Sequence, residues 1–265
     1  MRRSALPVVV VACAIVAAVL AWLVVGRMFR ATSGAPAGPP VAETRAVGEF
    51  AKLDVSGHLK LEIVQADRYE VVVEAAPGEA ARVRTEVSGR TLRITAKAAG
   101  GRRGRDGVDR DLRVVVRAPS IEAVDLSGAV KFTAKALSVP AFRIDASGAT
   151  SIRIDSLDVE SLRLVGSGAV EADLAGRATE QSISLSGAGT VRGARLRSLS
   201  ARVDVSGAGS VVVNAEKSLR VSLSGAGIVE YLGTPELEES VSGLGRIKRR
   251  DAATSTSTRQ RLQVA

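Results

Sequence analysis

The sequence contains only one cysteine and one histidine in 265 residues. A single cysteine cannot form a disulfide within the chain, so no covalent cross-link stabilises the fold. Zinc sites use cysteine and histidine ligands, and a Ser-His-Asp triad needs a histidine base, so only His58 could take part in such chemistry. Because the residues around His58 suggest no such site, we predict no catalytic centre, no bound metal and no cofactor. A calcium site built from stacked aspartates is the remaining metal alternative.

Aromatic residues make up 3% of the chain, and the single tryptophan, Trp22, lies in a long apolar run. Glycan recognition by ring stacking is therefore disfavoured, since few rings remain for an exposed platform. Phe132, Phe142 and Tyr231 are expected to be internal. Small aliphatic residues must fill most of the core, which suits a fold of stacked layers.

The net charge of +9 is concentrated near the two ends of the sequence. Residues 1–30 carry four arginines and no acid, and residues 246–261 carry six basic residues against one acid. The charges of the remaining residues sum to zero. This distribution argues against a nucleic-acid-binding surface.

Residues 7–26 form a run of twenty residues without a charge. A helix of that length would span roughly 30 Å, the thickness of the hydrocarbon core of a bilayer. We predict that residues 1–30 are a membrane anchor, with a cleaved signal segment as the alternative, and that residues 31–46 are a linker. The rest of the chain is expected to be periplasmic or extracellular, in a single-pass membrane protein.

Residues 47–119 alternate between apolar and polar side chains in short runs, as half-buried strands do. Turn sequences such as Ser56-Gly57 and Ser88-Gly89 separate these runs, so we predict hairpins or a meander. The glycine-rich, charged residues 99–110 are expected to form an exposed loop, with contact to an anionic lipid or polymer as a second interpretation. Residues 251–265 are polar and low in complexity, and we predict that this tail is disordered.

A Ser-Gly-Ala sequence recurs every 18 to 20 residues in the second half of the chain. The copies begin at Ser127, Ser147, Ser167, Ser186, Ser206 and Ser224, with a degenerate copy at Ser242. About 20 residues at roughly 3.3 Å each give a perimeter of about 66 Å, which is one coil of a β-helix. We therefore predict β-helix repeats over residues 120–250, with glycine at each corner, and keep an antiparallel sandwich as the alternative.

Several segments together resemble the head GIN domain family, whose description is putative auto-transporter adhesin of the bacterial envelope. They are the opening LDVSGHLKLEIVQAD, the strand LRVVVRAP, the repeated SGAG turns and the closing VEYLGTP. The resemblance implies an all-β fold over residues 47–250, with a right-handed parallel β-helix like that of pectin lyases. It also implies a role in adhesion, without an established catalytic centre.

Two columns of charged residues are expected to face outward from the coils. Arginine occurs four residues before the serine at Arg143, Arg163, Arg202 and Arg220, and aspartate two residues before it at Asp125, Asp145 and Asp204. Stacked Asp125 and Asp145 could act as the paired carboxylates of a glycoside hydrolase. Arginines on the same face would instead neutralise them as an exposed ladder. We therefore predict an interaction face at these seven residues.

Three functions remain open from the sequence. The first, which we favour, is a membrane-tethered, non-enzymatic module for adhesion or envelope interactions, with an envelope protein or polysaccharide as partner. The second is a polysaccharide-active enzyme on the same scaffold. The third is an accessory or sensory module of an envelope signalling system. A charged ladder on a flat face would favour the binding module, and a groove with unpaired carboxylates would favour the enzyme.

Overall fold

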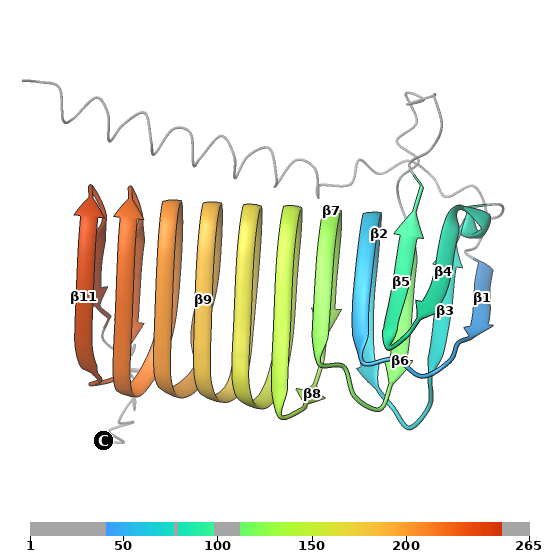
Figure 1. Cartoon of the computed structure of the whole chain (residues 1–265), viewed down its shortest axis with the longest axis horizontal. Helices are drawn as coiled ribbons and strands as arrows, with labels where there is room; N and C mark the ends of the chain where they lie inside the picture. Colours follow the sequence, from blue (N-terminus) through green and yellow to red (C-terminus); the bar gives the residue numbers. More distant parts are fainter. Residues whose placement is uncertain (1–40, 77–78, 98–111, 251–265) are drawn as a thin grey trace, which may run out of the picture.

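The computed structural model describes residues 41–76, 79–97 and 112–250, most of which lie in β-strands. Figure 1 shows an elongated row of coils, with the shorter strands at one end. The elements are β1 (Val41–Ala46), β2 (Lys52–Gln65), β3 (Glu70–Ala75), the 3₁₀ turn η1 (Ala80–Arg82), β4 (Val83–Ser88), β5 (Thr91–Ala96), β6 (Arg113–Ala118), β7 (Ala123–Ala134), β8 (Leu137–Ser138), β9 (Ala141–Gly225), β10 (Ile228–Leu232), β11 (Glu236–Gly243) and β12 (Arg246–Arg249).

The longest element, β9, runs for 85 residues and winds through several successive coils (Figure 1). At one corner of each coil, a glycine allows the extended chain to turn sharply. Gly148 has φ 86°, and a Cβ built on it would lie 2.5 Å from the carbonyl oxygen of Gly128 on the preceding coil. The corner therefore needs glycine both for its backbone conformation and for the close approach of the neighbouring coil.

Side chains from neighbouring coils stack in columns inside the stack. In parallel pairs Leu61 of β2 lies opposite Phe132 of β7, which lies opposite Ile152 of β9. All three are buried, with exposed fractions of 0%, 0% and 1%. Phe142 is buried as predicted, and so are the residues three positions before the first six repeated serines, namely Val124, Ile144, Leu164, Ile183, Val203 and Val221. The aliphatic core is therefore continuous from β2 along the coils.

The predicted parallel β-helix with a separate meander before it is wrong, because the sheet is mixed. The all-β class is correct, but β1 pairs antiparallel with β3, β3 with β6, and β4 with β5. The first strands also belong to the same sheet as the coils, since β2 lies parallel to β7, with Gly57 opposite Gly128. Ser56-Gly57 is thus a corner of the stack rather than a hairpin turn. A local Ser-Gly pattern does not distinguish these two cases.

The predicted transmembrane helix is not found in the described part of the chain. Across residues 41–76, 79–97 and 112–250 the structure has no helix that is long and apolar enough to cross a membrane. The run at residues 7–26 on which the prediction rested lies outside the described residues, as do residues 99–110 and the tail at 251–265. Of the predicted linker, residues 41–46 form β1.

The far end of the stack carries charged residues at positions where earlier coils bury apolar ones. Glu239 of β11 lies opposite the buried Val221, and Arg249 of β12 lies opposite Tyr231. Both charged residues are exposed. This end of the stack therefore does not continue the buried columns.

Candidate functional site

The predicted charged columns lie on one outward face of the coils. Asp125 of β7 is opposite Asp145 of β9, and Asp54 of β2 is opposite Asp125, so three aspartates stack on consecutive strands. The arginine side chains beside them are exposed, whereas Asp145 is half-buried. We call the seven predicted residues Arg143, Asp145, Arg163, Asp125, Arg202, Asp204 and Arg220 the charged ladder.

Most arginines of the charged ladder form an ion pair with an acidic side chain. Arg143 donates through two nitrogens to Asp145, with the longer bond at 3.1 Å, and Arg202 donates to Asp204 at 2.9 Å. Arg220 instead donates at 2.9 Å to Glu238 on the next coil. Its own coil has Ser222 at the position that Asp125, Asp145 and Asp204 occupy in theirs. The ladder therefore contains arginine–acid pairs both within a coil and between coils.

Asp125 differs from the other acids of this face, because it makes no ion pair with any described residue. The pKa of Asp125 is raised above its ordinary value of 3.8. Desolvation of its carboxyl is the main cause, followed by the neighbouring charge of Asp145 and then that of Asp54, while Arg143 partly opposes the shift. Stacked carboxylates with too few cations thus make the ionised form of Asp125 unfavourable.

We expect Asp125→Asn to stabilise the protein at neutral pH. A folded-state pKa above the unfolded value means that stability is lost as pH rises through these two values, so the charge at Asp125 is a cost at pH 7. Because the residue is exposed, the gain should be about 0.5 kcal/mol, within the range for like charges on neighbouring strands. Chemical denaturation at a series of pH values measures the gain, which should disappear below about pH 4.

Asp204→Asn is the matched control for this change. Asp204 has the same place in its coil, but Arg202 holds it and serines stand at the equivalent positions of both adjacent coils. This substitution should leave stability unchanged or lower it slightly. Equal effects of the two substitutions would contradict the like-charge explanation.

Arg163 is the ladder arginine that forms no ion pair within the described part of the chain. Its coil has Val165 where other coils have aspartate. Arg163 and Arg143 line a shallow hollow of about 240 Å³ together with Glu122 and the rim of Phe142. Neither Asp125 nor Asp145 lines this hollow. The paired carboxylates and the hollow are therefore separate features of the same face.

Sequence reasoning missed three members of this face. Asp54 continues the aspartate stack, Arg93 of β5 donates to it at 2.9 Å, and Glu238 pairs with Arg220. Asp54 could have been found, because it stands two residues before Ser56-Gly57, at the same offset as the other aspartates. Arg93 carries no such signal, since its coil has no Ser-Gly corner.

The single histidine lies on β2 and is exposed. It stands opposite Ala129 of β7 at the corner of the coil. Across the described ranges, no group of three or more His, Cys, Asp or Glu side chains is placed to hold a metal ion.

Comparison with known proteins identifies a family for most of the chain. The family model described as "putative auto-transporter adhesin, head GIN domain" matches residues 49–235. No curated protein matches the chain.

Several solved structures share the fold at low sequence identity. A putative adhesin from Bacteroides fragilis is 19% identical with a TM-score of 0.74, and the match covers 82% of this chain and 99% of that one. A putative adhesin from Parabacteroides merdae is 16% identical with a TM-score of 0.59, over 81% and 98% of the two chains. A protein from Parabacteroides distasonis, named a putative lipid binding protein, is 19% identical with a TM-score of 0.58, again over 81% and 98%.

Proposed function

We propose, because the chain belongs to the family described as putative auto-transporter adhesin, head GIN domain, that it is a binding module for adhesion or contact within the cell envelope. The module acts without catalysis, outside the cytoplasm, and recognises an envelope polysaccharide or protein. The observation that carries this proposal is the charged ladder, which places an arginine at the same height on four coils, with Ser182 on the coil between Arg163 and Arg202.

The regular spacing of the charged ladder suits a partner whose charged groups also repeat at a regular spacing. Strands of a sheet lie about 4.8 Å apart, so groups on successive coils are presented at a regular spacing. Arg163 has no acidic partner among the described residues, and Arg143 lies beside it at the hollow. An acidic group of the partner would complete the ion pair that the coil of Arg163 lacks. The fixed pairs on either side would then set the register of the partner.

The catalytic alternative rests on Asp125 and Asp145. Their stacking and the raised pKa of Asp125 are features of paired catalytic carboxylates. Two observations favour binding instead: Arg143 holds Asp145, and neither aspartate lines the nearby hollow. A carboxylate held by a guanidinium is poorly suited to act as nucleophile or base.

Capture from cell-envelope fractions tests the proposed function. We expect the immobilised 265-residue protein to retain an envelope polysaccharide or protein, and Arg143→Glu/Arg163→Glu to retain less than about a tenth of it. Arg177→Glu/Arg195→Glu, which reverses two exposed arginines outside the charged ladder, should bind like the parent protein. Equal binding by the two double variants would contradict a role for the ladder.

The same fractions test the catalytic alternative. Release of reducing sugar ends from an envelope polysaccharide by the parent protein, lost in Asp125→Asn/Asp145→Asn, would replace the binding proposal with an enzyme. We expect no release by either protein.

A further inference from the structure

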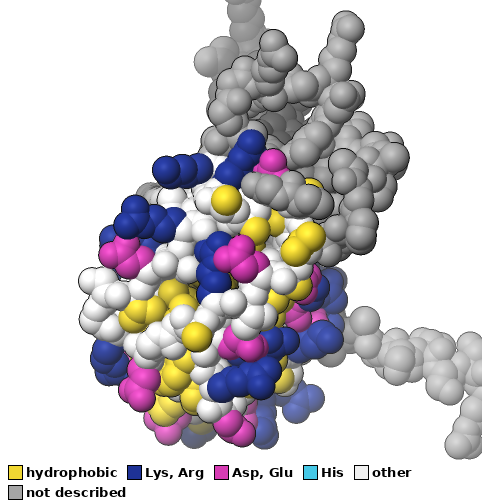
Figure 2. All heavy atoms as spheres, turned by 90° about the vertical axis from the view of Figure 1, so that its right-hand side faces the viewer, with side chains coloured by type: hydrophobic (Ala, Val, Ile, Leu, Met, Phe, Trp, Pro, Cys, Tyr) yellow, Lys and Arg dark blue, Asp and Glu magenta, His cyan; other side chains and the backbone are white. Residues whose placement is uncertain are grey.

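A basic pocket lies at the end of the stack opposite β11, away from the charged ladder. It is lined by Arg45 of β1, Arg82 of η1, Arg84 of β4 and Lys97, which follows β5, and has a volume of about 410 Å³. None of the described residues that line it is acidic. Figure 2 faces this end and shows basic side chains with acidic ones interspersed. The four cations thus come from separate elements to one hollow.

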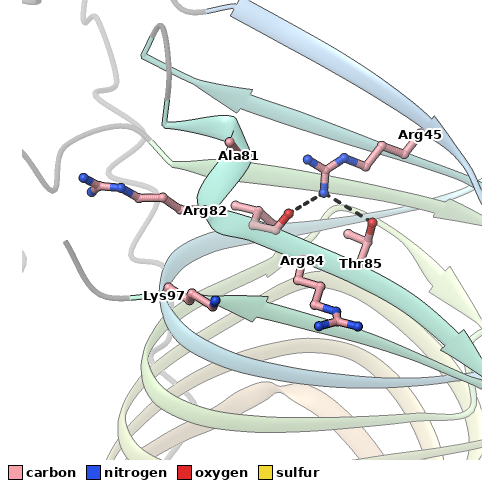
Figure 3. A pocket seen from close by; sticks show the side chains of 7 residues that line it. Arg45, Ala81, Arg82, Arg84, Thr85 and Lys97 are labelled. Carbon is pink, nitrogen blue, oxygen red and sulfur yellow. Dashed lines mark hydrogen bonds between the residues drawn. The ribbon is translucent and has the colours of Figure 1, made fainter. Parts of the chain in front are cut away.

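Arg45 forms a fixed part of the pocket. Its guanidinium reaches from β1 over β4, where it donates to the carbonyl oxygen of Val83 and, at 3.3 Å, to the hydroxyl of Thr85 (Figure 3). It also donates to the carbonyl oxygen of Ala80 at 3.1 Å. Its Nε donates to the carboxylate of Glu43 at 2.9 Å, and its side chain is only 18% exposed. The structure therefore places one positive charge at the edge of β4 without freedom to move away.

The other three cations are available to a ligand. Lys97 makes no ion pair with the residues that the structure describes. Arg84 meets Glu86 at 3.4 Å, with the two side chains 75% and 57% exposed, and Arg82 pairs with Glu79 at 2.7 Å. Exposed pairs of this kind contribute about 0–1 kcal/mol, so a multiply charged anion can displace them. In Figure 3 the side chains of Arg82 and Arg84 point away from the guanidinium of Arg45, toward solvent.

We propose that this pocket binds a small phosphate-bearing molecule, such as a sugar phosphate or a diphosphate. Guanidinium groups match the oxygens of a phosphate in a two-pronged arrangement, and an ammonium adds a compact charge. A volume of about 410 Å³ falls in the range of small-molecule sites and exceeds what a bare phosphate needs. This site is independent of the proposed function, because no residue of the charged ladder takes part in it.

Calorimetric titration of the 265-residue protein with inorganic pyrophosphate and with glucose 6-phosphate, at low ionic strength, tests this site. We expect saturable binding of one molecule per chain. Lys97→Gln/Arg84→Gln should weaken it at least tenfold, because two of the three available cations are removed. Neither side chain is buried, so the variant should fold, and circular dichroism checks this.

Lys131→Gln/Arg197→Gln is the matched control, since it removes the same charge from exposed residues outside the pocket. It should bind both phosphates like the parent protein. Equal weakening in the two double variants would overturn the site and leave only a general charge effect. Binding to phosphatidylglycerol vesicles without binding to either soluble phosphate would also overturn it, because a pocket of this kind takes up the soluble compounds.

Discussion

Gly148→Ala should lower the free energy of unfolding by roughly 3 kcal/mol. An alanine at a φ of 86° costs about 1–2 kcal/mol, because its Cβ crowds the backbone in the left-handed region. The added methyl group would also lie 2.5 Å from the carbonyl oxygen of Gly128, and overpacking of this kind typically costs about 1–3 kcal/mol. Because that neighbour is backbone on a packed coil, it cannot move aside as a flexible side chain would. Denaturant unfolding followed by circular dichroism measures the loss.

Two other glycines separate the causes of this loss. Gly89 has φ 58°, but nothing lies within 4 Å of the place that an added methyl group would take, so Gly89→Ala should cost only the conformational part, about 1 kcal/mol. Gly48 has neither restriction, and Gly48→Ala should be neutral or slightly stabilising. If Gly148→Ala costs no more than Gly89→Ala, the close approach of neighbouring coils is not what fixes glycine at the corner.

The corners illustrate what could be predicted about the fold. A glycine followed by a small residue at a period of 18 to 20 predicted corners, and Gly128, Gly148 and Gly168 all have positive φ. The same local sequence at Ser56-Gly57 was assigned to a hairpin, whereas Gly57 lies opposite Gly128 in a parallel pair. The partner of β2 is some 70 residues away along the chain. Local alternation indicates that a strand exists, but it does not tell which strand lies beside it or in which direction.

Among the antiparallel strands, β4 and β5 confirm the hairpin predicted at Ser88-Gly89, but the order of β1, β3 and β6 could not be predicted, for a related reason. β3 lies antiparallel between β1 and β6, and β4 extends the sheet through β5 alone. These strands have no repeat to align, so no column of equivalent positions reveals their register. Their positions in the sheet are fixed by the packing of buried residues such as Val71, Val73 and Val114.

For the same reason, the site on the repeated coils could be predicted better than the site on the strands outside the repeats. The charged ladder could be predicted as a set, because its members stand at fixed offsets from a recurring serine. The ion pairs within the ladder could not be predicted, because Arg220 donates to Glu238 on another coil, while its own coil has Ser222. The basic pocket could not be predicted at all. Arg45 lies on β1, and Lys97 follows β5, 52 residues further along the sequence.

The second large effect on stability is expected for substitutions of Leu61 and Phe132, which test whether β2 and the coils share one core. Phe132→Ala should lower the free energy of unfolding by about 3–5 kcal/mol, and Leu61→Ala by about 2–5 kcal/mol, since both residues are fully buried. They lie opposite each other in a parallel pair, so the double variant should deviate from the sum of the single effects by about 0.5–3 kcal/mol. Denaturant unfolding of the four proteins gives this coupling.

Leu61 and Leu219 form the control pair for this cycle. Leu219 is equally buried but lies on the coil beside β11, at the other end of the row in Figure 1. Its single substitution to alanine should cost a similar 2–5 kcal/mol, yet its effect should add to that of Leu61→Ala within about 0.5 kcal/mol. Additivity for both pairs would mean that the first strands form a core of their own. If Leu61 couples to Phe132 but not to Leu219, then β2 packs as a coil of the stack, because only residues in contact share a cavity and relax together.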